Sequence, residues 1–513
     1  MPPRRAPYTS SAYISERQLT TMAKGYKELK TQHVSGHVGS SLSDINSVSL
    51  AMPLTILLWS ALQSRMRQFT PYTASAFLID LVLSCGITLA ATTVYSSSPW
   101  LLNVLLVAPA AMIFFTNSRP PIPRRSSIRP PKKSDDTEQA KLDLLPIKPF
   151  LTNYRGSMMV ITCIAILAVD FRVFPRRFAK VENWGTSLMD IGVGSFVFTG
   201  GVVSVRSSLK TESGKLPPLS SRLLASLRHA LPLIVLGTAR LISVKGLDYA
   251  EHVTEYGVHW NFFFTLGFIP PFVALFQSLF ALVPSYAVLS CVLAFFYEIV
   301  LDKTNLRAFI LTAQRTDLLS KNREGIFSFF GYLAIFLAGQ SLGTYALPRQ
   351  VPLAKDASII TWLRHSILGK LIVSSALWTA LFFFSTSYYG LGLGVSRRLA
   401  NLPYFLWVCS FNSYQIAICC AIETIVFPDI HKATLREEEK QRCREATSTI
   451  LYAINRNGLA VFLLANLLTG LVNMTMPTLD MGVMSTMVVL VAYITCIAGV
   501  AVALDRADVS IKL

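Results

Sequence analysis

Residues 483–504 read VMSTMVVLVAYITCIAGVAVAL, an apolar run of 22 residues without a charged side chain. A helix that crosses the hydrocarbon core of a bilayer needs about 20 such residues, so this run predicts a membrane-spanning helix. Similar runs recur along the chain and predict an all-α polytopic membrane protein, a bundle of about thirteen transmembrane helices. The predicted span cores are 48–64, 76–95, 99–116, 157–171, 187–205, 229–242, 261–280, 281–300, 325–342, 369–391, 402–424, 457–476 and 483–504.

Composition supports a protein that resides in a lipid bilayer. The 513 residues are 52% hydrophobic and only 15% charged, whereas soluble domains carry about 25% charged residues. The net charge of +18 comes from short basic clusters between apolar runs, which argues against a nucleic-acid surface because such a surface needs a basic patch or stripe. Eight cysteines, mostly inside apolar runs and without a C-x-x-C pair, predict apolar packing instead of disulfides or zinc ligation.

The distribution of basic residues predicts the orientation of the bundle. Loops after odd-numbered spans, together with the C-terminus and with Lys370 at the edge of a span, hold 28 of the 47 Lys and Arg residues, and basic loops stay in the cytoplasm. We therefore expect segment 1–47 on the non-cytoplasmic side, a single membrane domain over 48–504 and a cytoplasmic tail over 505–513. The basic connection 117–155 is proline-rich and is expected to be a solvated cytoplasmic linker.

The predicted non-cytoplasmic connections carry most of the candidate site residues. Asp170 ends one apolar run, Lys180 follows ten residues later, and Pro175 between them breaks the helix. A reversal of the chain there would bring carboxylate and ammonium together at the membrane interface. Ionisable groups at this depth tend to pair or to line a working cavity. A desolvated carboxylate is suited to act as a general base, and a structural ion pair is the alternative.

Further candidates lie in the same segment. Arg176 and Arg177 have the chemistry to hold a phosphate, because arginine offers two parallel donors, although they could also extend to lipid headgroups. Trp184 and Asp190 follow in an aromatic and glycine-rich stretch and are added as substrate-binding candidates.

A second cluster reads HVTEYGVHWN over residues 252–261. His252, Glu255 and His259 are spaced to share one helix face. No fourth ligand cluster is visible, so we predict no metal site. His259 is instead a candidate base or hydrogen-bonding residue, and Glu255 and Asn261 are candidate substrate contacts. Two amides inside late spans, Asn412 and Asn466, are typical of helix-to-helix hydrogen bonds or of a pocket for a polar headgroup.

The same residues carry a resemblance to a known family. The chain resembles the GPI-anchored wall transfer proteins, the fungal counterparts of the inositol acyltransferase PIG-W. The resemblance spans residues 24–504, and its blocks include FPRRFAK at 174–180, WGTSLMDIGVGS at 184–195, EYGVHWNFFF at 255–264 and NREG at 322–325. The basic linker contains no such block.

The resemblance implies an endoplasmic reticulum enzyme that moves a palmitoyl-type chain from acyl-CoA to the inositol 2-hydroxyl of glucosaminyl-phosphatidylinositol. It implies that Asp170 and Lys180 form the catalytic pair, with His259 as a further candidate, in a site facing the lumen. Acyl-CoA would be a cosubstrate, no cofactor would be bound permanently, and direct transfer is preferred over an acyl-enzyme.

Other classes of protein also explain buried charges and interrupted helices. A transporter or lipid scramblase would use them to move a substrate without chemistry. A different acyltransferase would use His259 as its base, and a purely structural subunit would have no activity alone.

Overall fold

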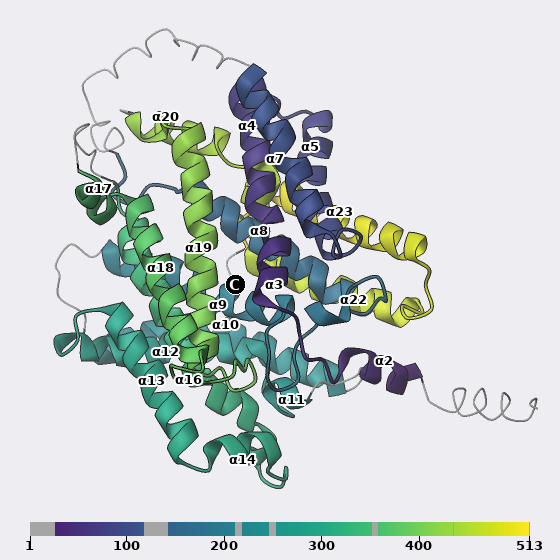
Figure 1. Cartoon of the computed structure of the whole chain (residues 1–513), viewed down its shortest axis with the longest axis vertical. Coiled ribbons are helices and arrows are strands. Elements are labelled where there is room, and N and C mark those ends of the chain that lie inside the picture. Colours follow the sequence, from purple (N-terminus) through teal and green to yellow (C-terminus); the bar gives the residue numbers. More distant parts are fainter. Residues whose placement is uncertain are drawn as a thin grey trace, which may run out of the picture.

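The computed structural model describes residues 26–116, 142–210, 218–245, 253–350, 358–433 and 435–511. Every regular element in these ranges is a helix, which confirms the predicted all-α class (Figure 1). In chain order they are α2 (Tyr26–Val34), α3 (Leu42–Ser49), α4 (Ala51–Met66), α5 (Ala74–Leu81), the π-helical turn η1 (Val82–Gly86), α6 (Ile87–Thr92), α7 (Pro99–Thr116), α8 (Pro149–Ala168), η2 (Arg176–Phe178), α9 (Leu188–Leu209), α10 (Leu219–Lys245), α11 (Val253–Tyr256), α12 (Phe262–Phe276), η3 (Gln277–Ala281), α13 (Tyr286–Lys303), α14 (Leu306–Thr312), α15 (Leu318–Lys321), α16 (Arg323–Ala346), α17 (Ile359–His365), α18 (Ile367–Thr386), α19 (Leu402–Val426), η4 (Ile430–Lys432), α20 (Arg436–Glu445), α21 (Thr449–Arg456), α22 (Gly458–Thr475) and α23 (Val483–Arg506).

Twelve helices among the described residues are long and apolar enough to cross a membrane, and each coincides with a predicted span. The predicted span 281–300 corresponds to α13, which is 18 residues long but contains Glu298, Asp302 and Lys303. With three charged residues, α13 is not among the helices that are apolar enough by composition to cross a membrane. The Glu298 side chain is 8% exposed and lies 3.3 Å from Arg307, so the charge is neutralised within the protein.

The connections between helices gather on two opposite faces, and this supports a thirteenth crossing by α13. On one face, hydrogen bonds join the N-terminal segment and the connections that follow even-numbered spans to one another: Lys30 to Asn473, Arg177 to Ser96, Lys180 to Glu255, Gly185 to Val395, and His259 to Asn322. On the other face, Arg349 bonds Glu439 and Arg444 bonds Asp505 near the C-terminus. The two ends of the described chain therefore lie on opposite faces, as an odd number of crossings requires.

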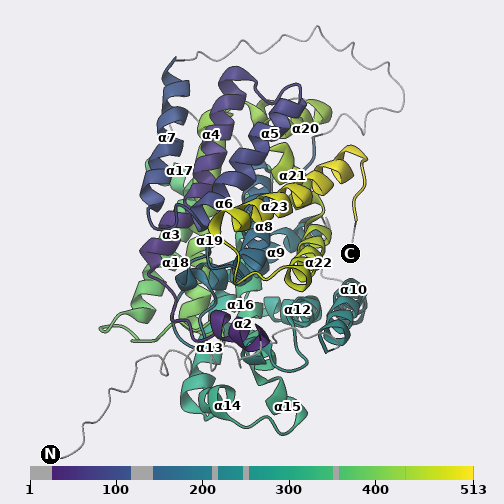
Figure 2. The same cartoon turned by 90° about the vertical axis from the view of Figure 1, so that its right-hand side faces the viewer.

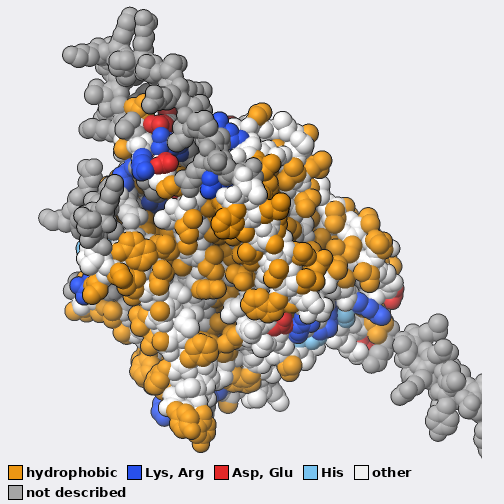
Figure 3. Space-filling model, turned by 45° about the horizontal axis from the view of Figure 1, so that its top comes forward, with side chains coloured by type: hydrophobic (Ala, Val, Ile, Leu, Met, Phe, Trp, Pro, Cys, Tyr) orange, Lys and Arg blue, Asp and Glu red, His pale blue; other side chains and the backbone are white. Residues whose placement is uncertain are grey.

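The figures show the same division. In both views α20 lies at one end of the molecule and α2 and α14 lie toward the other (Figures 1 and 2). Between these ends, hydrophobic side chains cover most of the face drawn in Figure 3, and charged side chains occur in small groups toward its margins. The exposed apolar residues come from helices such as α7, α10, α18 and α23, as expected for a surface in contact with lipid.

Helices α8, α9, α16 and α19 form the interior against which the others pack. Glycines allow a close approach between α9 and α16. A Cβ at Gly201 would overlap the carbonyl oxygen of Phe336, and a Cβ at Gly339 would overlap that of Phe198. Small residues at such crossings let two backbones pack closely in the absence of a hydrophobic driving force. This rigid pair supports one wall of the cavity described next.

Candidate active site

A cavity of about 240 Å³ lies on the face that holds the N-terminal segment. Its walls come from α8, α9, α10, α11, α12 and α22, together with the connections 169–187 and 387–401. The apolar part of the wall includes Ile161, Ala165, Val169, Val193, Phe196, Phe262 and Phe462. The ionisable and amide side chains are Asp170, Lys180, Glu182, Arg240, Glu255, Arg397 and Asn466. Charged and apolar side chains therefore line one cavity.

Asp170 follows the end of α8 by two residues and lies at the cavity. Its carboxylate accepts a hydrogen bond from Asn473 Nδ2 at 2.7 Å, and Lys30 Nζ donates to Asn473 Oδ1 at 2.8 Å. Burial raises the pKa of the Asp170 carboxyl above its usual range, while the Asn473 bond and the charges of Lys30 and Arg176 oppose that rise. Asp170 thus has the environment of a general base with elevated proton affinity.

Lys180 lines the same cavity but makes its ion pair with another residue. Its ammonium lies 2.6 Å from Glu255 Oε1 on α11. The Glu255 carboxylate also lies 3.5 Å from Arg397. Asp170 and Lys180 are thus brought to one cavity, while each makes its short polar contact with a partner distant in sequence. Lys180 is 35% exposed, so its ammonium is accessible from the cavity.

Arg397 connects the Lys180–Glu255 ion pair to the buried carboxylate of Asp190. Its Nε lies 2.6 Å from Asp190 Oδ1, and the two side chains are 5% and 0% exposed. Asp190 also accepts hydrogen bonds from the Ser187 hydroxyl and from the Val181 backbone amide. Because Val181 is adjacent to Lys180, its hydrogen bond to Asp190 holds the backbone next to Lys180 in place. Its position favours a structural role over the substrate contact expected from the sequence.

The two arginines expected to bind phosphate have other partners. The five N–H donors of Arg176 bond the backbone carbonyls of His33, Val169, Phe171 and Phe174. No donor of Arg176 is then left for a ligand. Arg177 pairs with Asp44 at 2.7 Å and bonds the carbonyl of Ser96. Neither arginine lines the cavity.

His259 lies outside the cavity wall. Its ring Nδ1 is 3.3 Å from Asn322 Nδ2, and its backbone amide donates to Asn322 Oδ1. His252 lies outside the described residues. Within the described ranges, no group of three or more His, Cys, Asp and Glu side chains is arranged to hold a metal ion.

The remaining candidates have structural contacts. Trp184 is exposed and lies over Gly394. Asn261 caps the start of α12 by accepting from the amides of Phe263 and Phe264. Asn412 is buried, accepts from the Tyr154 hydroxyl and donates to Ser195. Only Asn466 among these lines the cavity, where it donates to a carbonyl within α22.

Sequence reasoning missed three charged residues of the cavity wall: Glu182, Arg240 and Arg397. Arg397 and Arg398 are adjacent arginines in an otherwise apolar and glycine-rich connection. Their position beside a predicted span was the sequence signal that could have marked them as candidate site residues. Arg240 interrupts the last apolar turns of α10, where a charged residue is costly unless it has a function or reaches the interface.

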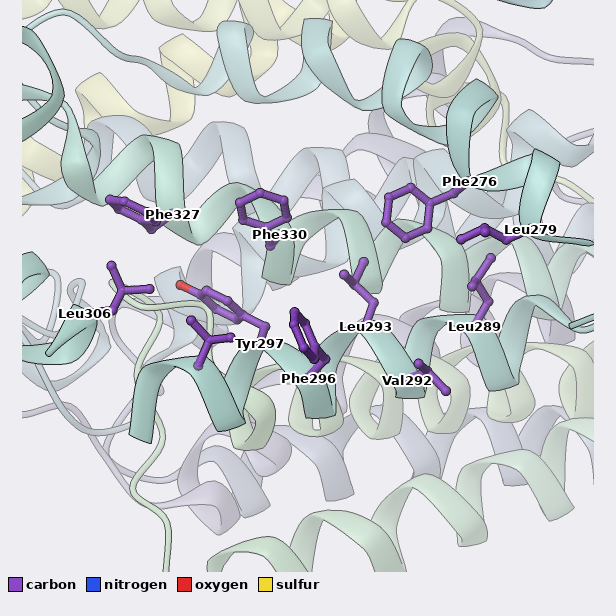
Figure 4. A pocket seen from close by; sticks show the side chains of 11 residues that line it. Phe276, Leu279, Leu289, Val292, Leu293, Phe296, Tyr297, Leu306, Phe327 and Phe330 are labelled. Atoms are coloured by element: carbon purple, nitrogen blue, oxygen red, sulfur yellow. The ribbon is translucent and has the colours of Figure 1, made fainter. Parts of the chain in front are cut away.

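A second, larger hollow contains no comparable chemistry. It has a volume of about 480 Å³ and is lined by apolar side chains and Tyr297, whose hydroxyl already donates to the Leu399 carbonyl. Figure 4 shows side chains of α13, such as Phe296 and Leu293, lying across from Phe330 and Phe327 of α16. This hollow has no acid, base or cation in its wall, so the charged cavity is the candidate active site.

The fold and this cavity define a multi-pass membrane protein with a charged pocket near one membrane face. A family model described as GWT1 matches residues 26–504. "GPI-anchored wall transfer protein 1" of Gibberella zeae is 54% identical over 496 residues, which is 95% of this chain and 99% of the relative. The protein of the same name from Aspergillus fumigatus is 52% identical over 96% and 99% of the two chains, and that from Saccharomyces cerevisiae is 38% identical over 95% and 99%. The chain belongs to the GWT1 family.

Proposed function

We propose that this protein is an enzyme of GPI-anchor biosynthesis that transfers a palmitoyl-type acyl chain from acyl-CoA to the inositol 2-hydroxyl of glucosaminyl-phosphatidylinositol. Family membership supports the pathway, since the relatives are named GPI-anchored wall transfer proteins. The observation that carries the reaction is that Asp170 and Lys180 line one cavity with an apolar wall. Such a cavity combines a base, a cation and room for a hydrocarbon chain.

In the proposed reaction Asp170 accepts the proton of the inositol hydroxyl. The hydroxyl oxygen then attacks the thioester carbonyl, a carbon–oxygen bond forms, the carbon–sulfur bond breaks, and the CoA thiolate leaves and is protonated. Lys180 stabilises the negative charge that develops on the carbonyl oxygen. The ion pair with Glu255 orients the Lys180 side chain. The phenyl rings of Phe196, Phe262 and Phe462 line the space for the acyl chain.

The cavity opens on the face that the basic-residue bias assigns to the non-cytoplasmic side. We therefore place the N-terminus and the active site at the lumenal side of the endoplasmic reticulum membrane, and the C-terminus in the cytoplasm. A protease-protection assay on microsomes, with an epitope tag at either end, tests this orientation: only the C-terminal tag should be digested.

The alternative in which His259 acts as the base has less support. Its imidazole lies against Asn322, a residue that also accepts two backbone hydrogen bonds. These hydrogen bonds to Asn322 stabilise the turn before α12, so His259 has a structural role there. We expect His259→Gln to retain most of the transfer activity.

The deciding experiment uses the purified full-length protein, radiolabelled palmitoyl-CoA and a short-chain glucosaminyl-phosphatidylinositol. The parent should form an acylated lipid, and Asp170→Asn and Lys180→Met should lower its rate of formation by about 10²-fold or more. Arg436→Met, which alters an exposed ion pair distant from the cavity, serves as the matched control. Product from Asp170→Asn at the parental rate would reject Asp170 as the base. Binding of both substrates by the parent without product would reject the transferase and favour the transporter.

A further inference from the structure

The chemistry of the proposed acceptor restricts where its headgroup can bind. In a phosphatidylinositol, the phosphate is attached to the ring carbon next to the one that carries the 2-hydroxyl. A cation that binds this phosphate must therefore line the same cavity as the proposed base. The glucosamine on the same inositol carries a primary amine, which is protonated near neutral pH. The headgroup thus presents a negative charge next to the reacting oxygen and a positive charge on the attached sugar.

Six ionisable side chains line the cavity, three of each sign: Lys180, Arg240, Arg397, Asp170, Glu182 and Glu255. Four of them are already engaged. Lys180 pairs with Glu255, Arg397 pairs with Asp190 and approaches Glu255, and Asp170 accepts from Asn473. Within the described residues, the side chains of Arg240 and Glu182 form no hydrogen bond or ion pair. One cation and one anion are thus left for a ligand.

Arg240 lies two residues before the end of the candidate membrane span Leu219–Ile242. It belongs to the last turns of α10, at the end nearest α11, and its side chain is exposed. The interface between hydrocarbon and water is the depth of lipid phosphates, and arginine side chains reach that depth from helix ends. The guanidinium binds phosphate oxygens through two parallel N–H donors.

Glu182 lies two residues after Lys180, on the same loop. Its backbone amide donates to the carbonyl of His37 at 3.1 Å, and this bond fixes the loop against the N-terminal segment. The carboxylate is thus attached to an ordered backbone at the cavity wall. A carboxylate in this position is a suitable acceptor for the hydrogen bonds of an ammonium group.

We propose that Arg240 binds the phosphate and Glu182 binds the glucosamine ammonium of the acceptor lipid. The proposal rests on the proposed function for the identity of the acceptor. It replaces Arg176 and Arg177 as the phosphate-binding residues. It also predicts that the two substrates are separable, because Arg240 acts on the lipid acceptor and not on the phosphates of acyl-CoA.

The first test compares Arg240→Gln, Arg240→Lys and the control Arg228→Gln, which alters an exposed arginine in the first half of α10. Loss of a charge-assisted hydrogen bond should raise the KM for the acceptor roughly tenfold or more. The KM for palmitoyl-CoA should not change, the lysine variant should lie between parent and glutamine, and Arg228→Gln should match the parent. A rise confined to the KM for palmitoyl-CoA, or no rise at all, would overturn the assignment of Arg240.

The second test uses Glu182→Gln with two acceptors, one with free glucosamine and one with N-acetylglucosamine, which carries no charge. The parent should prefer the amine, and the variant should lose most of this preference through a higher KM for the amine alone. An unchanged ratio of kcat/KM for the two lipids would overturn the role of Glu182.

A binding measurement separates this proposal from the proposed reaction. Equilibrium binding of dioctanoyl-phosphatidylinositol to the purified protein should weaken roughly tenfold in Arg240→Gln, whereas dioctanoylglycerol, which has no phosphate, should bind both proteins equally. Arg240-dependent binding without any acylated product would support the headgroup site and reject the transferase. Product formation together with phosphatidylinositol binding that does not depend on Arg240 would support the transferase and reject the headgroup site.

Discussion

Replacing Arg397 by methionine should destabilise the protein strongly, because this arginine neutralises a fully buried carboxylate. The Arg397 and Asp190 side chains are 5% and 0% exposed, and Nε and Oδ1 are 2.6 Å apart. Without the guanidinium, Asp190 would keep only the bonds from Ser187 and Val181. Removal of one partner from a buried ion pair costs about 3–5 kcal/mol, since the remaining charge stays buried without compensation.

An exposed pair provides the scale for this effect. Arg436 lies 3.1 Å from Asp143, and the two side chains are 40% and 44% exposed. Exposed ion pairs contribute about 0–1 kcal/mol, so Arg436→Met should change stability little. The double variant Arg397→Met, Asp190→Asn removes both buried charges and should be more stable than Arg397→Met alone.

Thermal unfolding of detergent-purified protein, followed with a thiol-reactive fluorescent dye, measures these differences. The reporter suits this chain because all eight cysteines are free and six are buried, and the six buried thiols react only when the fold opens. The reasoning would be refuted if Arg397→Met shifted the midpoint no more than Arg436→Met. It would also be refuted if the double variant were less stable than the single one.

Three further predictions concern the base, the lysine and helix packing. Asn473→Ala removes a hydrogen bond that lowers the pKa of Asp170, so the acidic limb of kcat/KM against pH should move to higher pH, with activity recovered as pH rises. Lys180→Met should lower kcat by about 10²-fold while the unfolding midpoint stays near that of the parent, since the side chain is 35% exposed. Gly201→Val should cost about 1–3 kcal/mol by overpacking the crossing with α16. Gly470→Ala should not, because a Cβ there meets no atom within 4 Å, and the same dye assay distinguishes the two.

The membrane topology was largely predictable from the sequence. Long apolar runs are a local property of the chain, and twelve of them coincide with helices, although the helices that contain the predicted spans 157–171 and 229–242 begin earlier, at Pro149 and Leu219. The predicted spans 261–280 and 281–300 are almost continuous in the sequence, with Pro270, Pro271 and Pro284 along them. In the structure α12 continues through Pro270 and Pro271, and the helices separate at 277–285, where Pro284 lies. The first span begins earlier than predicted, at Leu42, because α3 runs into α4.

The identity of the charged site residues was only partly predictable. The density of ionisable residues over 170–190 located the correct segment, and Asp170, Lys180, Glu255 and Asn466 do line the cavity. Asp190 and Asn412 are polar residues buried in the bundle for structural reasons, and the sequence does not distinguish such residues from ligand contacts. A buried polar residue that stabilises the bundle and one that contacts a ligand are of the same residue types, and only their surroundings in the folded protein differ.

By itself the sequence determined the all-α membrane class, the approximate positions of the membrane-spanning helices and the segment that holds the cavity, because each follows from hydrophobicity and charge along contiguous stretches. Only the tertiary structure decided the pairings. Lys180 meets Glu255, 75 residues away, and Asp170 meets Asn473, 303 residues away. Which opposite charges and amides come within 3 Å depends on how the helices place their loops on a shared face, and spacing along the chain does not encode that arrangement.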